Sequence, residues 1–218
     1  MTTITTIYQP CYYPKLHYFS RINYSDKFII LDDVEFSRRS RQHRAEINFE
    51  QKKWMTIPVK HTGSKTLILE AEIDNAQKWQ TNHIKTLQHK YGESYKLLEP
   101  FYTNVMQEET QFLGSFTSDI LKHIIAKLNI DVDIYYSSQI GCSNSGNPSE
   151  YLAKLTAAVS GDTYYLGSSA YSRYIEKREF KKRNIDLRIQ DWTPKWPDGN
   201  VCILDVLLNS NKPRTFIS

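Results

Sequence analysis

Hydrophobic and polar positions along the chain form short blocks that predict strands and helices in alternation. Residues 3–8 are a β-branched run that predicts a strand, and Pro10 closes it because proline has no amide hydrogen for a sheet ladder. Residues 18–22 then place apolar side chains at helical spacing, and residues 27–31 form a compact apolar run typical of a strand buried on both faces. Strand, helix and strand in this order predict a βαβ unit.

The alternation continues through the rest of the chain. Further strands are predicted at residues 54–59, 66–73, 131–137, 162–167 and 185–189, with 66–73 as the neighbour of 54–59. Further helices are predicted at residues 75–91, 108–128, 148–160 and 172–182, with a last short helix or turn at 202–209. We therefore expect a single α/β domain over residues 1–218, with a mixed or mostly parallel sheet flanked by helices.

Composition agrees with this picture. The 218 residues are 40% hydrophobic and 24% charged, as in an ordinary globular domain, and the net charge of +4 does not by itself imply a nucleic-acid partner. No segment reads as a signal peptide or as the roughly 18 to 20 apolar residues of a membrane span. The three cysteines show no CxxC spacing, which favours structural thiols in a reducing compartment. We expect a soluble, cytoplasmic protein.

A first candidate cluster follows the first predicted strand. Gln9, Tyr13, Lys15 and His17 surround the point where the predicted helix begins. A helix N-terminus presents free amide groups and the positive end of its dipole, so this loop could hold an anion. The alternative is a rigid strand-to-helix turn with aromatic packing.

A second candidate cluster begins where the second strand ends. Asp32 and Asp33 are paired carboxylates, which can bind a metal or divide into acid and base roles. The arginines of residues 38–44 follow them, and their planar guanidinium groups suit phosphate or carboxylate. The carboxyl ends of adjacent parallel strands are where ligands bind in such sheets, so this position favours function. The alternative is a solvated charge run whose members neutralise one another.

A third, weaker candidate is the turn after residues 162–167. Gly167, Ser168 and Arg173 could cradle a phosphate or a carboxylate, although a serine-capped turn would contain the same residues. Three histidines, His83, His89 and His123, are predicted on different helix faces or elements, and no HExxH motif is present. We therefore predict no metal site.

The motifs of the chain resemble those of the WbqC-like protein family. The chain reads QPxYxP from Gln9, then SDxFxxLDDVxFSxRSxQxR over residues 25–44, then PVK at residues 58–60. Later matches are Trp79 in an IDxxxxW context, Tyr91, the apolar helix after Glu108, YLGS at residues 165–168, Phe180, Asn184-Ile185 and ILD at residues 203–205. His17 departs from the family pattern, where glycine is expected, and its side chain would narrow a pocket mouth.

The resemblance implies a role in bacterial lipopolysaccharide or O-antigen biosynthesis. It suggests a transferase that moves an acyl or aminoacyl group to a nucleotide-activated amino-sugar. On this hypothesis Asp32, Asp33 and His17 carry the chemistry. The substrate would be bound by Gln9, Tyr13, Lys15, Arg38, Ser40, Arg44, Gly167, Ser168 and Arg173, with Ser40 and Arg44 directed inward because both match the family pattern.

Two alternatives stay open at this stage. The first βαβ unit is similar to nucleotidylyltransferase-like domains, which would imply nucleotidyl transfer, although the chain lacks a complete HxGH motif. A noncatalytic module that grips tRNA, another nucleic acid or an anionic partner through its arginines would also fit. The sequence identifies no cofactor, beyond an activated acyl or nucleotide donor, and no oligomeric state.

Overall fold

A parallel sheet forms the centre of the protein. A computed structural model describes all residues except 1, 49–51, 62–64, 99–109 and 145. Among the described residues, the sheet contains five strands, and every neighbouring pair is parallel. The strands are β1 (Ile4–Tyr8), β2 (Lys27–Ile30), β5 (Asp133–Tyr136), β6 (Thr163–Leu166) and β7 (Asp186–Ile189). The predicted α/β fold with a parallel sheet is confirmed, as is the pairing of the first two predicted strands.

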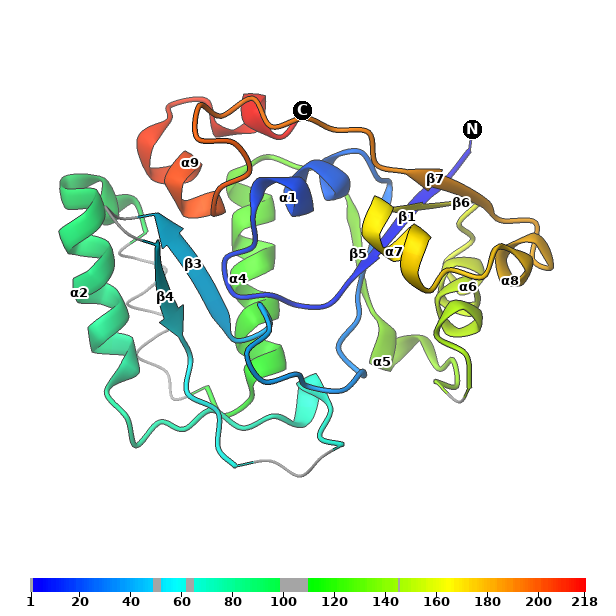
Figure 1. The fold of residues 1–218 in the computed structure, drawn as a ribbon, viewed down its shortest axis with the longest axis horizontal. Helices are drawn as coiled ribbons and strands as arrows, with labels where there is room; N and C mark the ends of the chain where they lie inside the picture. Colours follow the sequence, from blue (N-terminus) through cyan, green and yellow to red (C-terminus); the bar gives the residue numbers. More distant parts are fainter. Residues whose placement is uncertain (1, 49–51, 62–64, 99–109, 145) are drawn as a thin grey trace.

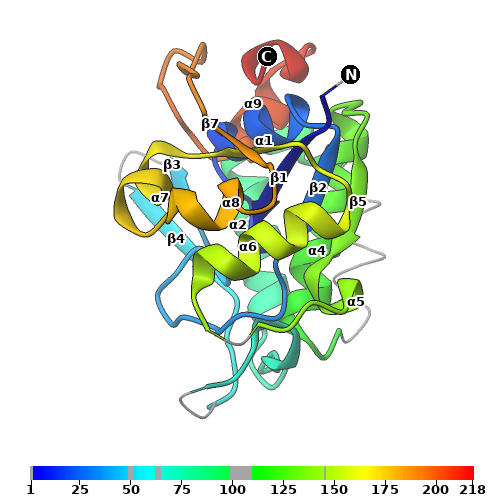
Figure 2. The ribbon, with the colours of Figure 1, turned by 90° about the vertical axis from the view of Figure 1, so that its right-hand side faces the viewer.

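Helices cover both faces of this sheet. Helices α1 (Leu16–Asn23) and α4 (Leu113–Lys127) lie on one side, and α6 (Pro148–Ala158) and α8 (Lys177–Lys181) lie on the other (Figures 1 and 2). Two buried clusters correspond to the two faces, because side chains of a strand alternate between them. In β2, Phe28 and Ile30 join the first cluster, and Ile29 joins the second. This two-sided burial explains the uninterrupted apolar run.

The remaining elements extend the first side and the ends of the sheet. A two-stranded antiparallel hairpin stands apart from the main sheet. The other elements are β3 (Arg44–Asn48), β4 (Lys52–Thr56), η1 (Ile68–Glu70), α2 (Trp79–Tyr91), η2 (Gly92–Leu97), α5 (Ser137–Ile140), α7 (Ser168–Arg173), α9 (Ile203–Asn209) and η3 (Pro213–Phe216). No helix in the described part of the chain is long and apolar enough to cross a membrane.

One predicted strand was wrong, one strand was not predicted, and one helix begins later than predicted. Residues 66–73 contain the short helix η1 and isolated bridges instead of a strand, and the partner of β4 is β3. Ala45 and Ile47 face the core while charged residues flank them, so the strand pattern of β3 was hidden by its charges. The helix predicted at residues 108–128 begins at Leu113 in the described residues, and its first two predicted positions lie outside them.

The predicted helix at residues 172–182 is two helices, α7 and α8. Tyr174 leaves the helical region with φ −145°, and the chain turns before α8 begins. Ser149 at the start of α6 fixes this turn, because its hydroxyl donates to the carbonyl oxygen of Tyr174 and accepts from the amide of Glu176. A tertiary contact therefore overrides the local helical pattern.

The strand order β5-β2-β1-β6-β7 places a topological switch point between β1 and β6. From β1 the chain passes through α1 to β2 on one side, and from β6 it passes through α7 and α8 to β7 on the other. Connections that diverge in this way leave a crevice at the carboxyl ends of the two central strands. The order thus predicts where a ligand would bind.

Candidate functional site

A cavity of about 810 Å³ lies at the switch point. The carboxyl end of β1 contributes Tyr8 and Gln9, that of β6 contributes Leu166 and Gly167, and Gln190 follows β7. Side chains of α1, α6 and α7 complete the walls, and five aromatic residues take part, namely Tyr8, Tyr151, Tyr164, Tyr174 and Trp192. No Asp or Glu is among the described residues that line it. The cavity is therefore partly aromatic and carries positive charge.

Arg21 supplies the buried part of that charge. Only 6% of Arg21 is exposed, and its Nε and Nη2 groups donate to Oε1 of Gln190 at 3.1 and 2.8 Å. Its guanidinium carbon lies 4.9 Å from the centroid of the Tyr8 ring. Among the described residues, no carboxylate oxygen lies within 4.0 Å of it. A buried guanidinium without a counter-ion is costly unless an anion joins it, so Arg21 is a candidate for anion binding.

Gly167 makes room for Arg21. A Cβ at position 167 would lie 2.6 Å from Nη2 of Arg21, while φ of −81° suits any residue. Gly167→Ala is therefore expected to displace the guanidinium without backbone strain. We expect the free energy of unfolding to change by less than about 1 kcal/mol, and the affinity for pyrophosphate to fall roughly tenfold or more by calorimetry.

Ser169→Ala is the matched control, because Ser169 lines the same turn but is exposed. Equal affinities for pyrophosphate in the wild type and the Gly167→Ala variant would contradict a role for the guanidinium position.

His17 lies on the same face of α1 as Arg21, four residues earlier. Asn200 holds it from two directions: Oδ1 accepts the backbone amide of His17 at 3.1 Å, and Nδ2 lies 2.8 Å from Nδ1 of its ring. Nε2 lies 3.4 Å from the Tyr8 hydroxyl. Burial lowers the pKa of His17 to about 4, with Arg21 adding to the effect, so the ring is neutral at pH 7.

Asp33 reaches the cavity wall through Tyr151. The Tyr151 hydroxyl donates to Oδ2 of Asp33, and the Ser137 hydroxyl lies 2.5 Å from Oδ1. Burial raises the pKa of Tyr151, and the neighbouring Asp33 adds to it, so the hydroxyl keeps its proton. Tyr151 lines the cavity, whereas Asp33 stands behind it.

Asp32 is turned to the other side of the strand end. It is 7% exposed, and its carboxylate accepts from the Ser138 amide at 3.0 Å and from the Ser138 hydroxyl at 2.7 Å. It lines a second, smaller cavity of about 350 Å³ beside Tyr136 and Asp119. In this arrangement Asp32 holds the beginning of α5.

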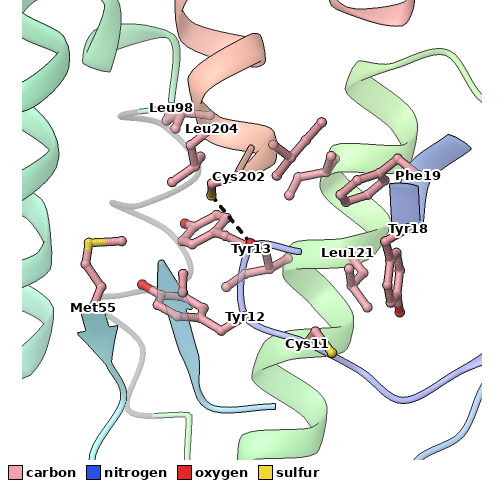
Figure 3. Close-up of a cluster of buried hydrophobic side chains, with 14 of the residues drawn as sticks. Cys11, Tyr12, Tyr13, Tyr18, Phe19, Met55, Leu98, Leu121, Cys202 and Leu204 are labelled. Atoms are coloured by element: carbon pink, nitrogen blue, oxygen red, sulfur yellow. Dashed lines mark hydrogen bonds between the residues drawn. The ribbon is translucent and has the colours of Figure 1, made fainter. Parts of the chain in front are cut away.

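The first two amides of α1 are not free for a ligand. The amide of Leu16 donates to the Val201 carbonyl oxygen at 3.1 Å, and Asn200 takes that of His17. Tyr13 is 3% exposed and packs in the core beside Tyr12 and Cys202 (Figure 3). Nζ of Lys15 lies 3.5 Å from Oε2 of Glu46 in β3. The anion site thus belongs to the far end of α1 and not to its beginning.

The arginines of residues 38–44 surround the hairpin of β3 and β4. Arg44 lies 4.3 Å from the Trp54 ring centroid and donates to the carbonyl oxygen of Arg39. Arg38 is exposed and donates to the Lys60 carbonyl oxygen, and the Ser40 hydroxyl accepts from the Gln42 amide. The described lining of the large cavity contains no residue of this segment.

The cavity does bring together predicted residues from two distant segments, 9–17 and 167–173. These are Gln9, His17, Gly167, Ser168 and Arg173. Ser168 and Arg173 are exposed at its rim, whereas Gln9 and His17 are half-buried.

Sequence reasoning did not select several residues that build the site. They are Arg21, Asn200, Gln190, Tyr151, Tyr174 and Gln42. For Arg21 a signal was present, because it lies four residues after His17 in a helix whose other positions are mostly apolar. For Asn200 and Gln190 no local pattern marks a contact across more than 170 residues.

Metal-ligating and thiol groups do not gather at this site. No cluster of three or more His, Cys, Asp or Glu residues suited to a metal occurs in the described ranges. Burial raises the pKa of Cys11 and of Cys202 to about 12, so both thiols stay protonated. All three cysteines are free.

The fold and the cavity define a doubly wound α/β protein with a positively charged cavity at its switch point. The model of the WbqC-like protein family matches residues 9–215, so the chain belongs to that family. A relative from Mycobacterium tuberculosis, "Uncharacterized protein Rv1507c", is 26% identical over an alignment that covers 93% of this chain and 92% of the relative. No solved structure matches the chain significantly.

Proposed function

We propose that this protein is a transferase of bacterial surface-polysaccharide biosynthesis that binds a nucleotide-activated amino-sugar in the large cavity. The observation that carries the proposal is Arg21, a buried guanidinium without a carboxylate partner among the described residues. Arg173 at the rim supplies a second positive charge, and a diphosphate has two groups to meet both.

The walls of the cavity support the nucleotide part of the proposal. Tyr174 is 51% exposed at the rim, and Trp192 is half-buried, so each offers a ring against which a base can stack. Ile7, Leu152 and Leu166 supply apolar surface deeper in the cavity. A volume of about 810 Å³ is within the usual range for a cofactor-sized ligand.

The proposed reaction is acyl or aminoacyl transfer to the amine of the sugar. The amine nitrogen attacks the carbonyl carbon of an activated acyl donor, an amide bond forms, and the carrier leaves while the amine loses a proton. Asp33 is the carboxylate best placed to receive that proton, by way of the Tyr151 hydroxyl. The likeness to nucleotidylyltransferase-like domains keeps nucleotidyl transfer as a second form of the proposal.

Calorimetric titration with nucleoside diphosphates tests the binding step. We expect nucleoside diphosphates to bind and the corresponding nucleosides to bind at least about tenfold more weakly, because they lack the group that neutralises Arg21. Raising the salt concentration should weaken this binding only moderately, since a single small site displaces few counter-ions. Equal affinity for nucleoside and diphosphate would contradict the proposal.

A second candidate function rests on the β3–β4 hairpin. Trp54 is 41% exposed, and Arg41 and Arg44 lie over its ring at 5.3 and 4.3 Å. Cations beside an exposed aromatic ring suit single-stranded nucleic acid. A steep fall of nucleic-acid affinity with salt, together with no binding of nucleoside diphosphates, would favour this noncatalytic alternative.

A further inference from the structure

Two chains of hydrogen bonds that begin at backbone amides end at the cavity. A backbone N–H can only donate, so whatever side-chain atom it meets must accept. That requirement fixes the orientation of each side-chain amide and ring further along the same series of hydrogen bonds. Without it, the oxygen and nitrogen ends of Asn and Gln side chains could not be told apart.

The first chain runs through Asn200, His17 and Tyr8. The amide of His17 donates to Asn200, which identifies that atom as Oδ1 and leaves Nδ2 facing Nδ1 of the ring. Nδ2 donates, so Nδ1 carries no proton and the neutral ring carries it on Nε2. Nε2–H then points to the Tyr8 hydroxyl oxygen at 3.4 Å.

The Tyr8 hydroxyl can donate its proton to a ligand in the cavity. Its oxygen accepts from His17 and also interacts with Arg21. Burial raises the pKa of Tyr8, so the hydroxyl remains protonated at pH 7. No acceptor for that proton is found among the described residues, and Tyr8 lines the cavity.

The second chain runs through Gln42 and Gln9. The amide of Ser37 donates to Oε1 of Gln42 at 2.7 Å, so Nε2 of Gln42 must face Gln9. Nε2 donates to Oε1 of Gln9 at 2.9 Å. This contact turns the Oε1 end of the Gln9 amide toward Gln42, so its NH₂ end lies on the other side of the amide and can donate to a ligand.

We infer that the polar end of the cavity, formed by Tyr8, Gln9 and Arg21, presents donors only, and that Asn200 and Gln42 are the positioning residues that set this polarity. The ligand group seated there must therefore accept every bond, as a deprotonated phosphoryl group does. A protonated amine has no lone pair for these donors, and a sugar hydroxyl would leave its own proton without an acceptor there. The inference rests on the proposed function for its ligand, although the polarity itself is a property of the ligand-free protein.

The tautomer of His17 tests the polarity directly. We expect ¹⁵N NMR of the full chain, labelled at histidine and assigned with His17→Gln, to show the proton on Nε2 and a bare Nδ1 at pH 7. A proton on Nδ1, or a doubly protonated ring, would overturn the inference. This readout needs no ligand, so it stands or fails independently of the proposed function.

Asn200→Asp reverses the first chain with almost no change in shape. One carboxylate oxygen still accepts the His17 amide, while the other now accepts a proton from Nδ1. Bare Nε2 then accepts the Tyr8 proton, which is withdrawn from the cavity. At about pH 8.5, roughly two units above the ordinary pKa of histidine, we expect the proton on Nδ1 and a loss of pyrophosphate affinity of about tenfold or more.

Asn144→Asp is the matched control, because it places the same new charge on the cavity wall away from His17. We expect it to weaken pyrophosphate binding less than about threefold. Tyr8→Phe, which removes the donor and keeps the ring, should reproduce the loss seen for Asn200→Asp if that variant folds poorly. Equal losses in the two Asn→Asp variants, or unchanged binding in Tyr8→Phe, would overturn the inference. If the wild type binds neither pyrophosphate nor nucleoside diphosphates while Nε2 carries the proton, the proposed function fails and the polarity stands.

Discussion

Arg21→Met is expected to make the ligand-free protein more stable and at the same time to weaken binding of nucleoside diphosphates strongly. Arg21 is a buried cation that no carboxylate neutralises among the described residues, so the folded state bears the cost of its desolvation. Methionine keeps the length of the apolar stem and removes the charge. We expect the free energy of unfolding to rise by about 1 kcal/mol and diphosphate affinity to fall by about 2–3 kcal/mol.

Urea denaturation and calorimetry measure the two effects separately. Arg188→Met is the control, because Arg188 is exposed and lies 4.6 Å from the centroid of the Tyr24 ring, outside the cavity lining. Its replacement should change the stability by no more than about 0.5 kcal/mol and leave binding unaltered. A large loss of stability in Arg21→Met would show that Arg21 holds the fold together. The anion site would then lose its main support.

A gain in stability together with a loss of diphosphate affinity distinguishes a binding residue from a structural one. Most substitutions of buried residues lower stability, because they open cavities or leave partners unsatisfied. A group that is positioned to bind a ligand often lowers the stability of the ligand-free protein. Gln190 would lose one partner in Arg21→Met, yet its Nε2 would still donate to the His17 carbonyl oxygen at 2.9 Å.

The first sixty residues show how far local patterns reach. The β-branched run of β1 and the apolar run of β2 predicted two adjacent parallel strands, and residues 5–8 pair with residues 27–30 as expected. Strand order beyond them depends on pairing between β1 and β6, whose residues lie about 160 positions apart in the chain. No periodicity within either strand encodes that contact, so the switch point could not be located from the sequence.

The candidate site also contains residues that local sequence could identify and residues that it could not. Gln9, His17 and Gly167 follow strand ends that form one crevice, and their polar character at those places could be recognised locally. The four arginines of residues 38–44 drew attention because they are dense, yet Arg44 stacks on Trp54. Arg21 is a single cation in helix α1 and was not among the predicted site residues. What distinguishes it is the missing counter-ion, which only the packing of β6 and β7 against α1 reveals.

Asp32 and Asp33 are adjacent positions with separate roles. Both lie beyond the end of β2 and both carboxylates contact the Ser137 hydroxyl, but each has a further partner of its own. Asp32 turns toward the beginning of α5, where Ser137 and Ser138 contact it, and Asp33 turns toward Tyr151 on the cavity wall. The sequence could offer both as candidates but could not assign them to faces.

Asp32→Ala is therefore expected to cost about 3 kcal/mol of folding stability, since it leaves the Ser138 amide and the Ser138 hydroxyl without their acceptor in a buried place. Its affinity for nucleoside diphosphates should remain within about twofold of the wild type at a temperature where both are folded.

Asp33→Ala should lose little stability and much activity. We expect a stability loss of only about 1 kcal/mol and a rate of amide formation lower by about a hundredfold, because Tyr151 loses its acceptor and the amine loses its base. Denaturation curves and acyl-transfer assays on the two variants, side by side, decide the matter. If Asp32→Ala were the variant that loses transfer while it folds normally, the catalytic carboxylate would face the smaller cavity, and the reaction would have to be placed there.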